Sequence, residues 1–238
     1  MKLALSALTL AIGLGTGFAA FAAGESHLHE GDVLPLLVDG QIVLDDLDDK
    51  EVDFATGYPI FEADFGDLAG GPNSTDDPGY DHEAGQFTPG TLLAFKVLGP
   101  LEFWNGSQWT VDTPATVTFS DALGNDVAIT GVSAAGASGL IGQIDGDGNL
   151  HEHIDMSIDA GAATGAYAVV LSLFGLLADQ TTPVYGESAP FMIVFNRGLA
   201  FEDFEAAVGA RVVPVPAAAW LFGSALAGLG LARRRRAG

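Results

Sequence analysis

The chain has 238 residues, of which 31 are acidic and nine are basic, so its formal net charge is −22. Between residues 23 and 212 the imbalance grows to 31 acidic against four basic residues, a net charge of −27, which would repel phosphate backbones and anionic lipid headgroups. The composition therefore excludes nucleic acid as a partner and predicts a hydrated surface that attracts cations. Because the chain has no cysteine, disulfides and thiolate metal sites are excluded as well.

Residues 1–22 have the pattern of a secretory signal peptide. Lys2 is followed by an apolar stretch and then by the small-residue sequence Ala20-Phe21-Ala22, which is typical of a cleavage site. An uncleaved N-terminal membrane anchor is the alternative interpretation. Both interpretations predict that the residues after this segment are exported.

Segments of extended character recur through residues 23–212, separated by clusters of Gly, Pro, Asn and Asp that mark turns. Asp39-Gly40 can adopt the positive φ angles that a tight hairpin turn needs. This rhythm predicts an all-β body, a β-sandwich or a jelly-roll-like fold. The predicted strands are residues 33–38, 41–44, 91–97, 115–120, 126–132, 151–158, 165–177 and 189–196.

Two parts of the body depart from that rhythm. Residues 45–90 are acidic and poor in regular pattern, which predicts long loops with one strand near residues 58–65. Residues 201–208 are predicted as a helix with Phe201, Phe204 and Val208 on one side. Because no internal repeat divides the body, we expect one domain.

Four of the five histidines form two His-x-His pairs, His27 with His29 and His151 with His153. In a strand, residues i and i+2 point the same way, so each pair would present two imidazoles about 6.6 Å apart along the chain, within reach of one metal ion. Chance histidines on a solvent-facing strand, or on a frayed N-terminus, are the alternative interpretation.

Residues 151–158 carry the better-defined pair. Their alternation places His151, His153 and Asp155 on one face of a strand and apolar residues on the other. Sites rich in imidazole suit Zn²⁺, so the sequence predicts a divalent metal site with zinc as the metal. The predicted ligands are His27, His29, His82, His151, His153 and Asp155.

Calcium is the second metal to consider. Residues 145–149 are similar to the start of an EF-hand loop, but Met156 stands where that loop needs a bidentate glutamate, which favours a glycine-rich turn. The acidic residues 45–49 and 76–83 would also suit Ca²⁺, although such runs are equally typical of solvated loops.

Signals for catalysis are weak. The chain lacks His-Glu-x-x-His and Gly-x-Ser-x-Gly, and no histidine follows His153 to complete a cupin-like site. We therefore expect a non-catalytic protein. A metal-dependent hydrolase or oxygenase, with Glu152 or Asp155 as the general base, is an alternative.

A metal-free polysaccharide-binding module is the other alternative. Trp104, Trp109 and Tyr80 are the aromatic residues that would stack on sugar rings. Residues 103–109 are equally typical of a hairpin whose aromatic side chains pair across its two strands.

The C-terminal segment has the features of a single membrane span. Residues 215–232 carry no charge, and a helix of this length, at about 1.5 Å per residue, just crosses a hydrocarbon core of roughly 30 Å. The four arginines that follow would hold the C-terminus in the cytoplasm, which places the body outside.

This tail resembles a PEP-CTERM sorting signal in all three of its parts. They are the proline motif Val213-Pro214-Val215-Pro216, the apolar stretch with Trp220-Leu221-Phe222-Gly223, and Arg233, Arg234, Arg235 and Arg236. The resemblance implies that an exosortase, a membrane protease-transpeptidase of Gram-negative bacteria, removes the tail and passes the body to the cell surface or extracellular matrix. Val215 departs from the family pattern, because it stands where the name-giving motif has glutamate.

A second resemblance concerns the body. The paired His-x-His segments, together with residues 188–199 and the tail, are similar to PEP-CTERM proteins whose expression is governed by a zinc-responsive repressor. The resemblance implies a zinc-linked role in the envelope. The sequence thus predicts an envelope or matrix protein that binds zinc, with an exosortase, the inner membrane and extracellular polysaccharide as its partners.

Overall fold

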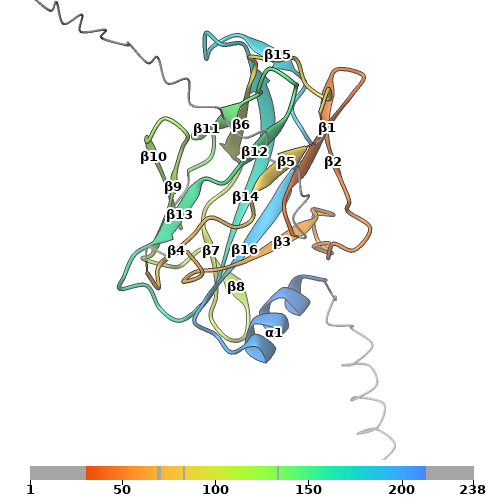
Figure 1. The fold of residues 1–238 in the computed structure, drawn as a ribbon. Helices are drawn as coiled ribbons and strands as arrows, with labels where there is room; N and C mark the ends of the chain where they lie inside the picture. Colours follow the sequence, from red (N-terminus) through yellow and green to blue (C-terminus); the bar gives the residue numbers. More distant parts are fainter. Residues whose placement is uncertain (1–30, 69–70, 83, 133, 213–238) are drawn as a thin grey trace, which may run out of the picture.

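The computed structural model describes residues 31–68, 71–82, 84–132 and 134–212, which are mostly β-strands (Figure 1). The predicted all-β class is therefore confirmed. Three sets of predicted features lie outside the described residues: the signal peptide, the pair of His27 and His29, and the tail of residues 213–238. Within the described ranges, no helix has the length and apolar character that a membrane crossing needs.

The largest sheet has eight strands and is centred on β14 (Gly165–Leu176), the longest strand of the described chain. β14 is almost wholly apolar, as is typical of a strand covered on both faces. The other strands are β11 (Ser138–Gln143), β6 (Leu92–Val97), β16 (Phe191–Arg197), β3 (Ile60–Asp64), β7 (Glu102–Trp104), β8 (Trp109–Thr110) and β15 (Pro183–Tyr185). Only β3 is paired in parallel, alongside β16, among the pairings of this sheet.

A second sheet of four strands and two small ribbons complete the β-structure of the described residues. The four-stranded sheet contains, in spatial order, β10 (Asp126–Thr130), β9 (Thr116–Ser120), β13 (Asp155–Ile158) and β4 (Ser74–Thr75). One ribbon pairs β1 (Leu34–Val38) with β2 (Gln41–Asp45), and the other pairs β12 (Leu150–Glu152) with β5 (Tyr80–His82). The turn between β1 and β2 is the predicted one, with φ of 51° at Asp39 and 82° at Gly40.

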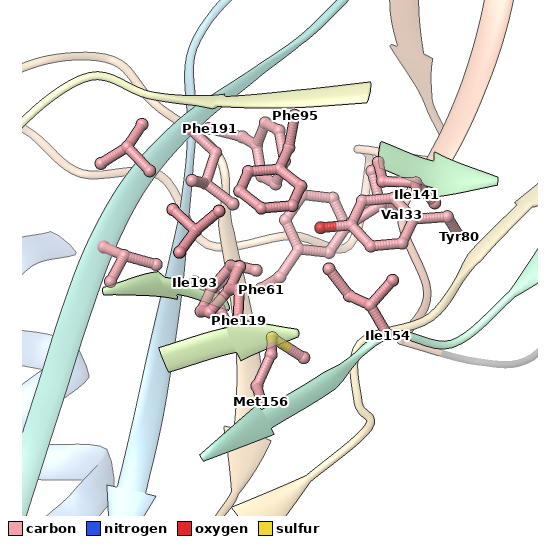
Figure 2. Packing of buried hydrophobic residues seen from close by; sticks show 14 of the residues in the cluster. Val33, Phe61, Tyr80, Phe95, Phe119, Ile141, Ile154, Met156, Phe191 and Ile193 are labelled. Atoms are coloured by element: carbon pink, nitrogen blue, oxygen red, sulfur yellow. The ribbon is translucent and has the colours of Figure 1, made fainter. Parts of the chain in front are cut away.

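The two sheets share one hydrophobic core. Phe119 of β9 lies between them, with its ring centroid 5.4 Å from that of Phe95 on β6 and 6.2 Å from that of Phe195 on β16. Figure 2 shows Met156 beside Phe119, and Tyr80 beside Ile141. Alternation explains this packing, because β9 buries Val117 and Phe119 and turns the residues between them outward.

The helix α1 (Phe201–Val212) covers the opposite face of the large sheet at one end (Figure 1). Phe204, Ala207 and Val208 are buried against β14 and β16, as the helical spacing predicts for two of them. The prediction that Phe201 is buried with them is wrong, because Phe201, the first residue of the helix, is 74 % exposed.

Two other predictions need correction or refinement. Residues 151–158 do not form one strand, because residues 150–152 pair with β5 whereas residues 155–158 pair with β9 and β4. Residues 45–90 contain the short strands β4 and β5 in addition to the expected β3. Both differences arise from pairing partners that are distant in the chain.

Candidate metal site

The ribbon of β5 and β12 positions the second His-x-His pair. Its antiparallel register places His151 opposite Asp81 and Leu150 opposite His82. Because neighbouring residues of a strand point to opposite faces, Asp81 and His151 share one face while His82 lies on the other. The ring of His82 is buried there, 4.5 Å from the ring of Phe87. The same-side prediction for His151 and His153 is confirmed, since their ring centroids lie 5.4 Å apart.

His153 follows the end of β12, and its ring lies directly over Gly79. A Cβ atom at Gly79 would stand 2.5 Å from Cε1 and Nε2 of that ring, so only glycine leaves room for it. Nδ1 of His153 lies 3.0 Å from the carbonyl oxygen of Asp76, and because a carbonyl can only accept, Nδ1 is the donor in this hydrogen bond. A hydrogen on Nδ1 leaves Nε2 able to bind a metal, which is how metal-binding imidazoles are commonly oriented.

Asp32 faces that nitrogen. Its Oδ2 atom lies 3.8 Å from Nε2 of His153, and its Oδ1 atom accepts a hydrogen bond of 2.8 Å from the backbone N–H of Gly79. The segment is held against β5 by two backbone hydrogen bonds, from Val33 N to Gly79 O and from Asp81 N to Val33 O. Asp32 is 5 % exposed, and no described residue donates a hydrogen bond to its Oδ2 atom.

Asp77 lies beside the same histidine, in the loop between β4 and β5. Its backbone N–H donates to the hydroxyl of Thr75, and its exposed carboxylate places Oδ1 3.5 Å from Nδ1 of His153. One ligand atom from each of Asp32, Asp77 and His153 can be chosen so that all three lie within 4.8 Å of one another. This group could hold a metal ion.

The charges of the described residues leave these carboxylates without a lysine or arginine partner. Lys96 pairs with Glu187, and Arg211 pairs with Asp53 and Glu102. No ion pair of the described part of the chain joins either cation, or Lys50 or Arg197, to Asp32, Asp77 or Asp81. Burial of Tyr80, and the nearby charge of Asp32, raise the pKa of the Tyr80 hydroxyl, so this group stays neutral beside them.

Only part of the predicted ligand set meets in this group. His153 belongs to it, His151 lies beside it, and His82 is turned away from it by the alternation of β5. Asp155 lies outside the group, on the separate strand β13. His27 and His29 lie outside the described residues.

Asp32 and Asp77 are the ligands that sequence reasoning missed. Asp77 lies in the acidic run of residues 76–83, which was considered for calcium, so a signal for it existed. Asp32 had none, because only its long-range pairing with the residues around Gly79 distinguishes it from the other acidic residues.

A groove of about 630 Å³ adjoins the site, and both His153 and Asp155 line it. Glu152 also lies on its wall; partial burial raises the pKa of Glu152, although His151 and His153 act in the opposite direction. Across the groove, hydrogen bonds from Asn125, Leu123 and Leu140 outweigh burial and lower the pKa of Asp121. The groove wall therefore carries two carboxyl groups whose pKa values are shifted in opposite directions.

The other candidate features serve the fold. Residues 145–149 form a turn in which Asp145 accepts hydrogen bonds from the backbone of Asp147 and Asn149, so its carboxylate is engaged within the turn. Trp104 and Trp109 are paired across the β7–β8 hairpin, as the second interpretation of residues 103–109 predicts. Tyr80 is fully buried, which contradicts a role in stacking on sugar rings.

Comparisons of the chain with protein-family models, with curated proteins and with solved structures find no match. Function is therefore inferred from the chemistry of the site and from the sequence. One imidazole and two carboxylates, one of them buried, form a donor set for a divalent cation.

Proposed function

We propose that this protein binds a divalent metal, most suitably zinc, in the bacterial cell envelope and catalyses no reaction there. The protein would be exported, held briefly in the inner membrane by its tail, and then sorted by an exosortase to the cell surface or extracellular matrix of a Gram-negative bacterium. Its body would be a β-sandwich or jelly-roll-like domain. The observation that carries the metal-binding part is the meeting of Asp32, Asp77 and His153.

The spacing of these ligand atoms supports an ion between them. Two atoms bonded to zinc at about 2.1 Å lie about 3.4 Å apart when the geometry is tetrahedral. Nε2 of His153 and Oδ2 of Asp32 are 3.8 Å apart, so a small approach would place both at bonding distance. Asp77 lies on an exposed loop, and its side chain can close on the ion.

Burial of Asp32 gives this ion a further role. A carboxylate taken out of water without a charged partner costs several kcal/mol, which a bound cation would offset. The imidazole of His153 favours zinc over calcium, because calcium prefers six to eight oxygen ligands. Calcium, whose bonds of about 2.4 Å are longer, accepts ligand atoms that lie farther apart and is the competitor to test.

His27 and His29 remain proposed ligands of the same ion. His29 precedes Asp32 by three residues and His27 by five. At about 3.5 Å per extended residue, such short separations let an imidazole reach an ion held by Asp32. A fourth ligand from this pair would complete the tetrahedral coordination of a structural zinc site.

The sorting part of the proposal is supported by the tail alone. Its proline motif, apolar stretch and four arginines are features of an address rather than of an activity. Replacing Pro214 and Pro216 with alanine is expected to leave a larger, unprocessed protein in the inner-membrane fraction. Surface protein in undiminished amount and of processed size would argue against this part.

The metal-binding test is the zinc content of the protein, purified without a histidine tag, by elemental mass spectrometry and titration calorimetry. We expect at least one zinc per chain, and we expect Asp32→Asn/His153→Gln to abolish its tight binding. Asp155→Asn is the matched control, because this aspartate was predicted as a ligand but lies outside the group. Zinc absent from the wild-type protein would overturn the proposal.

A further inference from the structure

We infer that a second cation position lies beside the first and is formed by Asp81 and His151. The inference rests on the proposed function, because it extends the same metal site from one ion to two. It is drawn from the face of the β5–β12 ribbon that carries the two imidazoles, where a second carboxylate lies as deeply buried as Asp32.

Asp81 is the observation that points to a ligand. Its side chain is 1 % exposed, and neither carboxylate oxygen accepts a hydrogen bond from any described residue. The nearest charged or chargeable partner that the structure shows is His151, whose Nδ1 atom lies 3.4 Å from Oδ2 of Asp81. A buried carboxylate normally accepts several hydrogen bonds. A cation bound directly to the oxygens of Asp81 would compensate for their absence.

The 3.4 Å between Nδ1 of His151 and Oδ2 of Asp81 fits two ligands of one metal ion better than a direct hydrogen bond. An N–H···O hydrogen bond has its atoms about 2.7–3.2 Å apart, whereas two ligands of a tetrahedral zinc ion are about 3.4 Å apart. The cross-strand register of Asp81 and His151 fixes this separation, because the two residues face each other on paired strands. The pair therefore already has the spacing that an ion between its atoms requires.

The charge of the region also calls for more than one ion. Asp32, Asp77 and Asp81 together carry three negative charges when ionised, so one dication leaves one charge uncompensated. Lys96 and Arg211, the described lysine and arginine with ion pairs, form them elsewhere. The two imidazoles, 5.4 Å apart, give each ion its own nitrogen ligand within one site, in the manner of binuclear centres, whose ions lie about 3.5–4 Å apart.

The two positions should differ in affinity. The first has three protein ligands, whereas the second has two and would take water for the rest of its coordination. We therefore expect the second ion to bind more weakly and to exchange more readily. A protonated His151 that simply pairs with Asp81 is the competing explanation, and it predicts one ion per chain.

The test is the number of zinc ions bound by the metal-free full-length protein, followed by titration calorimetry and native mass spectrometry. We expect two ions for the wild-type protein, one tight and one weak. Asp81→Asn/His151→Gln should keep the tight ion and lose the weak one, whereas Asp32→Asn/His153→Gln should lose the tight one. Circular dichroism checks that each variant is folded, and His151→Gln alone replaces the double variant if that variant unfolds.

The outcomes separate the two proposals. One ion in the wild-type protein, unaffected by Asp81→Asn/His151→Gln, would overturn the second position and leave the proposed function standing. Loss of all zinc in that variant, with the fold intact, would also overturn it, because the pair would then belong to a single site. No zinc in the wild-type protein would overturn both proposals.

Discussion

Two buried sites of this protein treat their carboxylates in opposite ways. At the end of α1, Arg211 contacts Asp53 at 3.3 Å and Glu102 at 2.7 Å, and its guanidinium lies 3.9 Å over the ring of Trp109. On the β5–β12 ribbon, Asp32 and Asp81 are as deeply buried as Asp53, yet they face imidazoles. The carboxylates of the first site have an arginine partner, whereas the charged or chargeable partners of the second, among the described residues, are imidazoles.

The two sites differ in how the charge of their buried carboxylates is compensated. At Asp53, burial alone would raise the carboxyl pKa, but hydrogen bonds from Thr56 and the charge of Arg211 outweigh burial and lower the pKa. With these partners from the chain itself, the ionised Asp53 carboxylate stabilises the fold. With four lysines and arginines in residues 31–212, the protein uses one to fasten its terminal helix and none to neutralise the ribbon. The proposed metal binding would account for the carboxylates that no described lysine or arginine neutralises.

The largest effect is expected when the arginine of the α1 site is removed. Arg211→Met should lower the free energy of unfolding by about 3 kcal/mol, because it leaves the buried Asp53 without its partner. It also removes the contact with Trp109, whose Nε1 donates to Ala207 of the same helix. The measurement is urea unfolding, followed by tryptophan fluorescence.

The matched control removes a cation from an exposed pair. Lys96 and Glu187 are both well exposed, so Lys96→Met should cost less than about 1 kcal/mol. Equal losses in the two variants would show that burial does not distinguish the sites. Added zinc should change neither loss, because neither cation lies at the candidate metal group.

The next prediction removes the charge of one carboxylate in each site by replacing an aspartate with asparagine. In metal-free protein, Asp53→Asn should destabilise the fold by about 1–2 kcal/mol, because it weakens a charged, hydrogen-bonded pair. Asp32→Asn should instead stabilise it by about 1 kcal/mol, since the amide keeps the hydrogen bond from Gly79 and can donate to Nε2 of His153. Thermal unfolding in the presence of a chelator measures both.

Zinc should close most of the difference in stability between these two variants. At a zinc concentration 100 times its dissociation constant, the wild-type protein should gain about 2.7 kcal/mol, and the gain should vanish in Asp32→Asn. Asp53→Asn should retain the full gain. If Asp32→Asn lowers metal-free stability as much as Asp53→Asn does, the ribbon is a structural site and not a binding site.

Much of the fold follows from local patterns. Alternation identified most long strands, and Asp39-Gly40 identified the first hairpin. Residues 151–158 show the limit of such patterns, since their alternation continues while their pairing partner changes from β5 to β9. A pattern with period two reports which face is buried, but it cannot report which strand lies alongside.

The site shows the same limit more sharply. The spacing of His151 and His153 predicted two neighbouring imidazoles, because their proximity is local. Asp32 and Asp81 reach those imidazoles through pairing between residues 33 and 80 and between residues 81 and 151. Among 31 acidic residues, nothing local marks the few that will be buried. Half of the site was thus predictable, and the other half depends on the tertiary fold.

The smallest expected effect concerns Glu62. It extends the comparison of the two sites to a carboxylate that has neither an arginine nor an imidazole as its partner. Glu62 lies on β3 near α1, where partial burial and the charges of Glu205, Glu51 and Asp64 raise its pKa to about 7, despite an opposing effect of Lys50. Its ordinary pKa is 4.5, so between pH 4.5 and 7 the folded protein binds a proton that the unfolded chain has released. Stability must therefore fall as the pH rises through this interval.

Glu62→Gln should remove that dependence. Because Glu62 is only partly buried and solvent screens its interactions, we expect a gain of about 1 kcal/mol at pH 8 and almost none at pH 5. Urea unfolding at the two pH values measures the difference, with Glu202→Gln on α1 as a control that should leave it unchanged. A difference that persists in Glu62→Gln would assign the pH dependence to another group. Its loss would show that a proton balances the charge of Glu62, as arginine balances the α1 site and as a metal ion would balance the ribbon under the proposed function.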